Sequence, residues 1–221
     1  MILHTMTPAQ LVLEARKDLP ALRNKLVAPV IRLRKEHAFD PQGELVHMYP
    51  WTSPAKNNWL VVLKCTKRGV STHTLTWYKA KDGRIAALWL TGRGLSYHID
   101  AAVIEHFAAY ADESESPLER LQSFFFENYS YVMQVEEPQG EHHWNVSIGA
   151  GQGMGLGQWD TTTDIVHWRS FIHLGDLFPQ QHGQHAAMEH ERRWFDLSPG
   201  QRMELYDRAC GLERSRQGRA A

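Results

Sequence analysis

Alternation with a period of two residues dominates residues 142–157 and constrains the fold more than any other feature of the chain. The even positions are mostly apolar, whereas His143, Asn145 and Ser147 occupy odd positions and are followed by glycines. Successive side chains of a β-strand point to opposite faces, so the pattern predicts one apolar face and one face of small polar groups. We expect the glycines to leave the second face open to a ligand or to another stretch of backbone. These glycines include Gly153, Gly155 and Gly157.

Further alternating or β-branched segments predict two antiparallel meanders of about four strands each. Asp82-Gly83 and Pro138-Gln139-Gly140 are turn sequences of the kind that join antiparallel strands. Helices are expected at the N-terminus, in the middle and at the C-terminus, and together these elements give an α+β fold. The expected strands cover residues 45–49, 59–66, 72–79, 85–91, 131–136, 142–150, 154–159 and 164–174.

Three sequences resemble an N-terminal helix capping box, with a hydroxyl residue, a proline and then a Gln or Glu. They are Thr7-Pro8-Ala9-Gln10, Ser116-Pro117-Leu118-Glu119 and Ser198-Pro199-Gly200-Gln201. Pro20 is expected to kink the first helix, and Pro29 to end it or break it. The expected helices cover residues 8–27, 100–110, 117–128, 184–195 and 199–212.

Length and composition favour one domain without a membrane span. We expect a single α+β domain over residues 1–212, with halves at 1–115 and 116–212 as an alternative division, and a disordered basic tail at 213–221. The 24 basic and 25 acidic residues nearly balance, which gives no overall attraction to polyanions. No apolar run reaches the ~18–20 residues of a membrane span. The two cysteines suit a reducing compartment, so we expect a cytoplasmic protein.

A cluster of basic and imidazole side chains is expected beside the glycine face. In residues 164–174 the even positions make the better core face, so His167, Arg169 and His173 are expected to project together, with His143 on the same side. Imidazoles can act as acid and base near neutral pH, and a guanidinium can hold developing phosphate charge. The simpler alternative is that these side chains are only solvated and that the glycines accommodate a closely packed helix.

His98 and His106 form a second candidate group. His98 lies at an expected junction between a strand and a helix, where functional side chains are common, and His106 lies in that helix. An acid–base role, a packing role and a metal site with a third ligand from His37 or His73 are the alternatives. We predict neither a metal nor a cofactor.

From Tyr97 onward the chain resembles uncharacterised bacterial proteins of the mobile-element type, which have no assigned activity. Three segments carry the resemblance. They are Glu105-His106-Phe107, Gly153-Met154-Gly155-Leu156-Gly157 and Ser170-Phe171-Ile172-His173.

These features favour a metal-independent, RNase-like or other phosphoester-acting enzyme, of the kind related to toxin or defence systems. His143, His167 and His173 are the acid–base candidates and Arg169 the phosphate clamp. RNA or a small phosphate-bearing ligand is the expected partner. The alternative is a non-catalytic module that binds a ligand or a protein through Trp and Tyr side chains. The predicted binding residues are Asn145, Ser147, Gly153, Gly155, Gly157, His98 and His106.

Overall fold

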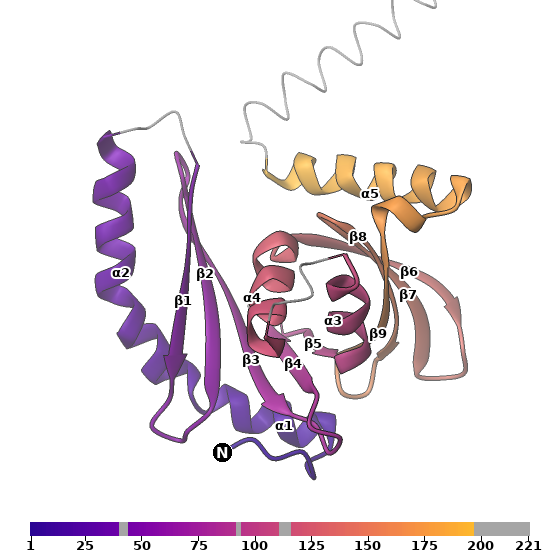
Figure 1. The fold of residues 1–221 in the computed structure, drawn as a ribbon, viewed down its shortest axis with the longest axis horizontal. Helices are drawn as coiled ribbons and strands as arrows, with labels where there is room; N and C mark the ends of the chain where they lie inside the picture. Colours follow the sequence, from indigo (N-terminus) through magenta and orange to yellow (C-terminus); the bar gives the residue numbers. More distant parts are fainter. Residues whose placement is uncertain (40–43, 92–93, 111–115, 197–221) are drawn as a thin grey trace, which may run out of the picture.

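The computed structural model describes residues 1–39, 44–91, 94–110 and 116–196, which form one nine-stranded sheet with helices around it (Figure 1). The strand order is β1-β2-β3-β4-β5-β9-β8-β7-β6. Neighbouring strands are antiparallel except for β5 and β9, which are parallel. The strands are β1 (Leu45–Thr52), β2 (Asn58–Thr66), β3 (Gly69–Lys79), β4 (Ile85–Leu90), β5 (Ser96–Ile99), β6 (Tyr131–Pro138), β7 (His143–Ala150), β8 (Gly153–Asp160) and β9 (Ile165–His173).

The α+β class is confirmed, but the prediction of two separate four-stranded meanders is wrong. The first meander has a fifth strand, β5, which is only four residues long. In β5, His98 pairs with His167 of β9, and this parallel pairing joins the two meanders into one sheet. Strands so far apart in the chain pair through tertiary packing, which local alternation does not reveal.

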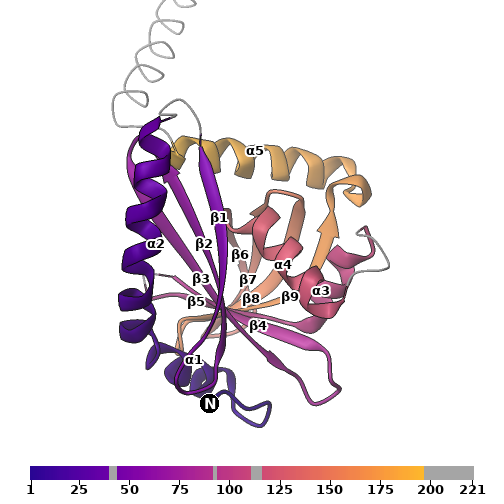
Figure 2. The ribbon, with the colours of Figure 1, turned by 60° about the vertical axis from the view of Figure 1, so that its left-hand side comes forward.

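Helices cover both faces of the sheet. α3 and α4 lie side by side over the central strands and bury a core that includes Trp89, Phe124 and Trp168 (Figure 1). α1 and α2 pack on the first strands from the other face, where α2 runs along β1 and β2 (Figure 2). The helices are α1 (Pro8–Arg16), α2 (Leu19–Phe39), α3 (Ala101–Ala108), α4 (Pro117–Asn128) and α5 (Pro179–Asp196), with a short 3-10 helix at Leu174–Asp176.

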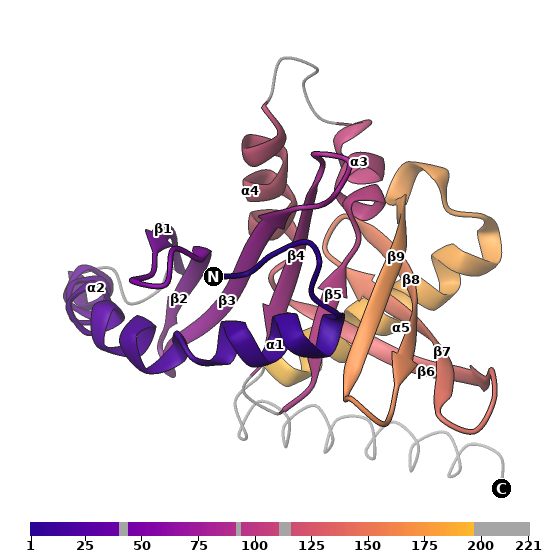
Figure 3. The ribbon, with the colours of Figure 1, turned by 90° about the horizontal axis from the view of Figure 1, so that it is seen from below.

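α5 lies on the same face of the sheet as α1 and α2, at the other end. Ile148 points into the core under α3 and α4, whereas a Cβ added to Gly149 would lie 2.7 Å from Cβ of Met188 in α5. In β9, Ile165 belongs to the α1 and α2 core and Val166 to the α3 and α4 core. Each strand is rotated by ~20–25° from its neighbour, so this face points in different directions at the two ends of the sheet (Figure 3). Between α1 and α5 the face carries polar side chains.

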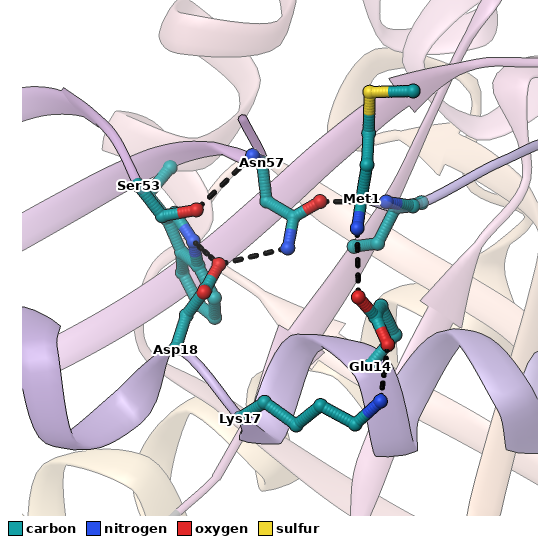
Figure 4. A network of polar contacts seen from close by, with 8 residues as sticks. Met1, Glu14, Lys17, Asp18, Ser53 and Asn57 are labelled. Carbon is teal, nitrogen blue, oxygen red and sulfur yellow. Dashed lines mark hydrogen bonds and ion pairs between the residues drawn. The ribbon is translucent and has the colours of Figure 1, made fainter. Parts of the chain in front are cut away.

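The expected first helix is two helices, because the chain turns at Lys17 and Asp18. Asp18 is buried, and its Oδ2 accepts hydrogen bonds from Asn57 Nδ2 at 2.8 Å and from Trp59 Nε1 at 3.1 Å (Figure 4). These bonds fix the turn against the β1–β2 connection. Pro20 lies in the first turn of α2, where a helix needs no backbone donor, and so fits there.

Pro29 does not end the helix, contrary to the prediction, because α2 continues through it to Phe39. A proline in a helix removes one hydrogen bond and clashes with the preceding turn. Leu26 and Leu33, on either side of Pro29, are buried against the sheet, and we attribute the survival of the helix to this packing.

Some predictions concern other parts of the chain. The expected helix at 199–212, its capping box and the tail at 213–221 lie outside the described residues. Within the described residues, no helix combines the length and the apolar content that crossing a bilayer requires.

Candidate functional site

Gly153, Gly155 and Gly157 of β8, which we call the glycine strip, are covered by core side chains. The β7–β8 turn has two residues, so Ala150 pairs with Gly153, and the glycines fall on the face of α3 and α4. A Cβ on Gly155 would lie 2.5 Å from Cζ2 of Trp168. The prediction of an open glycine face beside the polar positions of β7 is therefore wrong, because the two sets lie on opposite faces of the sheet. The affected glycines are Gly153, Gly155 and Gly157.

A β-bulge in β9 separates His173 from the other predicted catalytic residues. Consecutive residues of β8 pair with Trp168 and Ser170, which leaves Arg169 as the extra residue of the bulge. After the bulge, the odd-numbered side chains of β9 lie on the face that carries α3 and α4. His173 is one of them, and its ring stacks on that of Tyr110, which follows α3, with ring centroids 4.1 Å apart. The prediction that His173 projects beside the other candidates is therefore wrong.

His106 lies away from the other candidates, whereas Ser147 shares a face of β7 with Asn145 but is used in packing. His106 is exposed on α3, in the opposite layer. Ser147 is buried and donates its hydroxyl hydrogen bond to the Glu136 carboxylate, to which Gln184 of α5 also donates at 3.3 Å. Ser147 thus belongs to the packing between β7 and α5.

The structure brings four polar side chains into one row across the middle strands. Register partners on neighbouring strands point to the same face, ~5 Å apart. The row lies on the face that carries α1 and α5. Its members are Asn145 of β7, Gln158 of β8, His167 of β9 and His98 of β5. We call these residues the imidazole row.

His98 is the more deeply buried of the two imidazoles in the imidazole row. Its Nε2 is hydrogen-bonded to the Tyr78 hydroxyl at 2.7 Å, and its ring lies edge-on to His167, with centroids 5.7 Å apart. Among the described residues, its buried Nδ1 has no hydrogen-bond partner. Burial lowers the pKa of His98, the charge of His167 lowers it further, and Asp100 acts in the opposite direction. Burial also raises the pKa of Tyr78 to about 12.

His167 is half-buried and lies beside a cation. Burial lowers its pKa first, and the Arg169 charge adds to that effect, whereas Asp100 and Asp160 oppose it. Arg169 is exposed and donates from Nη2 to Gln158 Oε1 at 3.1 Å, which keeps the guanidinium at the imidazole row. The result is an imidazole that favours its neutral form, next to a permanent positive charge.

His143 lies in β7 two residues before Asn145, on the same face, and pairs with Asp160 of β8. Hydrogen bonding from Thr162 and Thr163, together with the charge of His143, lowers the pKa of Asp160 to about 2. The exposed His143 also contributes to the lowered pKa of His167, so the two imidazoles interact electrostatically. His143, His167 and Arg169, all predicted as site residues, therefore lie on one face.

A cleft of about 780 Å³ opens beside His98. Tyr78 and Asp100 line it together with the β3–β4 turn, including Arg84. Asp100 occupies the N-cap position of α3, but its side chain makes no capping hydrogen bond. The charge of Asp100 opposes, without reversing, the lowering of the pKa of His98 and His167 by burial.

Sequence reasoning missed Tyr78, Gln158 and Asp160 as members of this site. A signal for two of them was present, because the apolar even positions of β8 give way to Gln158 and Asp160 after Leu156. Tyr78 carries no such signal, since its neighbours depend on the pairing of β3, β4 and β5.

In the described part of the chain, no three His, Cys, Asp or Glu side chains are grouped so that they could hold a metal ion. The groups that the site offers are imidazoles, a guanidinium, a phenol and carboxylates.

Comparison with protein-family models, with curated proteins and with solved structures found no match to this chain. The resemblance to bacterial mobile-element proteins therefore stays a prediction.

Proposed function

We propose that the protein is a metal-independent, RNase-like enzyme that cleaves phosphodiester bonds at the imidazole row. The observation that carries the proposal is His167, a half-buried imidazole whose pKa is lowered by burial and by the adjacent Arg169. A neutral imidazole can accept a proton near pH 7, and a guanidinium binds phosphate oxygens in a two-pronged geometry. Perturbed titratable groups beside a cleft are more frequent at functional sites than elsewhere on proteins.

In the proposed reaction His167 removes the proton of a ribose 2′-hydroxyl, and the 2′ oxygen attacks the adjacent phosphorus. The bond from phosphorus to the 5′ oxygen breaks, and His143 donates a proton to that oxygen. The products are a 2′,3′-cyclic phosphate and a 5′-hydroxyl end. Arg169 stabilises the charge that develops on the non-bridging oxygens.

His98 and Tyr78 act as positioning residues in this proposal. Their hydrogen bond fixes the His98 ring, and the edge contact of that ring restrains His167. His173 and His106 take no part, because they lie outside the imidazole row.

The alternative is a non-catalytic module that binds a protein partner. α2 supports it, because Val27 and Ile31 are 56% and 51% exposed and line a hollow of about 640 Å³. Such a module would need no acid or base, so substitutions at His167 would leave partner binding unchanged.

The proposal is tested by cleavage of a fluorogenic, mixed-sequence RNA in the presence of EDTA. We expect His167→Ala to lower kcat/KM by about 10²–10⁴-fold, and Arg169→Ala, at an exposed position, to lower it without loss of fold. His106→Ala is the matched control, and it should cleave like the wild type. Absence of cleavage by the wild type, or equal rates for wild type and His167→Ala, would contradict the proposal.

A further inference from the structure

The cleft of about 780 Å³ that Tyr78, His98 and Asp100 line, here called the His98 cleft, contains a carboxylate that is open to a ligand. Asp100 lies in extended backbone directly after β5, and the preceding Ile99 points into the core under α3 and α4. Successive side chains of extended backbone alternate, so Asp100 lies on the same face as His98. The Asp100 carboxylate is half-buried and accepts no hydrogen bond from any residue that the structure describes.

The charges around the His98 cleft balance. Besides Asp100, three charged side chains of the β3–β4 turn line it: Lys81, Asp82 and Arg84. Arg84 Nε donates to Asp82 Oδ2 at 2.6 Å, and its Nη1 donates to Glu105 Oε2 at 2.9 Å, so this guanidinium is already engaged. Two basic and two acidic side chains give the lining no net charge, which favours a neutral ligand over a phosphate or a metal ion.

The remaining walls of the His98 cleft are small and apolar. Four alanines line it: Ala80, Ala86, Ala101 and Ala102. The half-buried Tyr78 contributes its ring and not its hydroxyl, because the hydroxyl is bonded to His98 at 2.7 Å. Methyl groups and an aromatic ring give a flat ligand dispersion contacts without imposing a hydrogen-bonding pattern, so the pattern is left to Asp100.

A carboxylate accepts hydrogen bonds and donates none. The Watson–Crick edge of guanine carries two adjacent donors, N1–H and the N2 amino group, which match the two oxygens of a carboxylate, and proteins read single-stranded RNA bases along this edge. Adenine, cytosine and uracil each place an acceptor beside the donor on that edge, and this acceptor would face a carboxylate oxygen. The His98 cleft therefore suits guanine better than the other RNA bases.

We propose that the His98 cleft binds a guanine base and that Asp100 is the residue that selects it. Asp100 N donates to Trp168 O at 3.0 Å, so Asp100 lies next to the bulge residue Arg169. A guanine base in the cleft thus brings its ribose and 3′-phosphate to His167 and Arg169. Cleavage on the 3′ side of guanosine rests on the proposed function, whereas the binding of guanine does not.

The test is isothermal titration calorimetry of the whole chain with guanosine, inosine, adenosine, cytidine and uridine. Inosine is the sharpest comparison, because it differs from guanosine only by the missing N2 amino group. We expect guanosine to bind about tenfold or more tightly than each of the others. Asp100→Asn exchanges one acceptor for a donor, keeps a side chain that is common at helix N-caps, and should lose about tenfold or more in guanosine affinity. The matched control is Asp176→Asn, exposed in the 3-10 helix, which should bind guanosine like the wild type.

Three outcomes would overturn the inference: no binding of guanosine at millimolar concentration, equal affinities for guanosine and inosine, or an unchanged preference for guanosine in Asp100→Asn.

Guanosine 3′-monophosphate separates this inference from the proposed catalysis. Its phosphate should reach Arg169, so we expect it to bind more tightly than guanosine does, and Arg169→Ala to lose most of this gain while binding guanosine like the wild type. A 3′-phosphate that adds nothing to the affinity, with the guanosine results as expected, would contradict the proposed function and leave the guanine site standing.

Discussion

Replacing Gly155 by alanine tests how tightly the core closes over β8. The new methyl group would lie 2.5 Å from Cζ2 of Trp168, a fully buried side chain whose Nε1 donates to the Ser170 carbonyl at 2.9 Å. Overpacking costs about 1–3 kcal/mol, and a displaced indole weakens a hydrogen bond worth about 0.5–1.5 kcal/mol. Alanine recovers about 0.5–1 kcal/mol of backbone entropy in a strand. These terms together span about 0.5–4 kcal/mol, and we expect Gly155→Ala to lower the free energy of unfolding by about 2 kcal/mol, near the middle of that span.

Urea unfolding, followed by circular dichroism, measures this change. Gly183→Ala is the matched control, because the residue is exposed in α5 and, apart from its chain neighbours and the backbone of its own helix, no atom of the described residues lies within 4 Å of its added Cβ. The same methyl group should there raise the free energy of unfolding by about 0.5–1 kcal/mol. If Gly155→Ala proves as stable as the wild type, the glycine strip is open and the account of the core given above is refuted.

Three further predictions concern stability. Asp18→Ala leaves two buried donors without their acceptor and should cost about 2–4 kcal/mol, whereas Asp176→Ala, at an exposed position, should change stability in urea by less than about 0.5 kcal/mol. Ser116→Ala removes the capping hydroxyl of α4 and should lower the urea midpoint by the equivalent of about 1 kcal/mol; an unchanged midpoint would argue against the cap. Because the pKa of His167 is lowered from 6.5 in the folded state, the unfolded chain binds more protons below that pH, so Tm should fall as the pH drops from 7 to 5, and less so in His167→Gln.

Local patterns predicted most of the elements. Period-two alternation located β7 and β8 within about one residue, because each strand presents one face to a core. The sequences Thr7-Pro8-Ala9-Gln10 and Ser116-Pro117-Leu118-Glu119 both form capping boxes at the helix starts, as predicted. Such signals depend on interactions between residues a few positions apart, so they can be read from the sequence.

The face of the sheet on which each strand side chain lies could not be predicted in the same way. Extending one alternation through Gly151 and Gln152 placed the glycines on the polar face, whereas a two-residue turn puts them on the core face. One extra residue at Arg169 moved His173 to the other side of the sheet. Both errors arise because a shift of one residue reverses every later side chain in a strand.

The pairing that forms the candidate site also depends on tertiary structure. His98 and His167 were both named as candidates, but in different groups, and nothing near either residue shows that β5 and β9 are neighbours. Parallel pairing between distant strands follows from how α3, α4 and the second meander pack, which is a property of the whole chain.

The pH dependence of RNA cleavage tests the central claim most directly, by comparing log kcat/KM for the wild type and Arg169→Gln. If His167 is the base, the acidic limb of the wild-type profile lies below pH 6.5, because burial and the Arg169 charge lower the pKa of this imidazole. Removing the positive charge favours the imidazolium form, so the limb should move to higher pH in Arg169→Gln, whatever happens to the maximum rate. A limb that stays at the same pH in both proteins would show that His167 is not the group that accepts the proton.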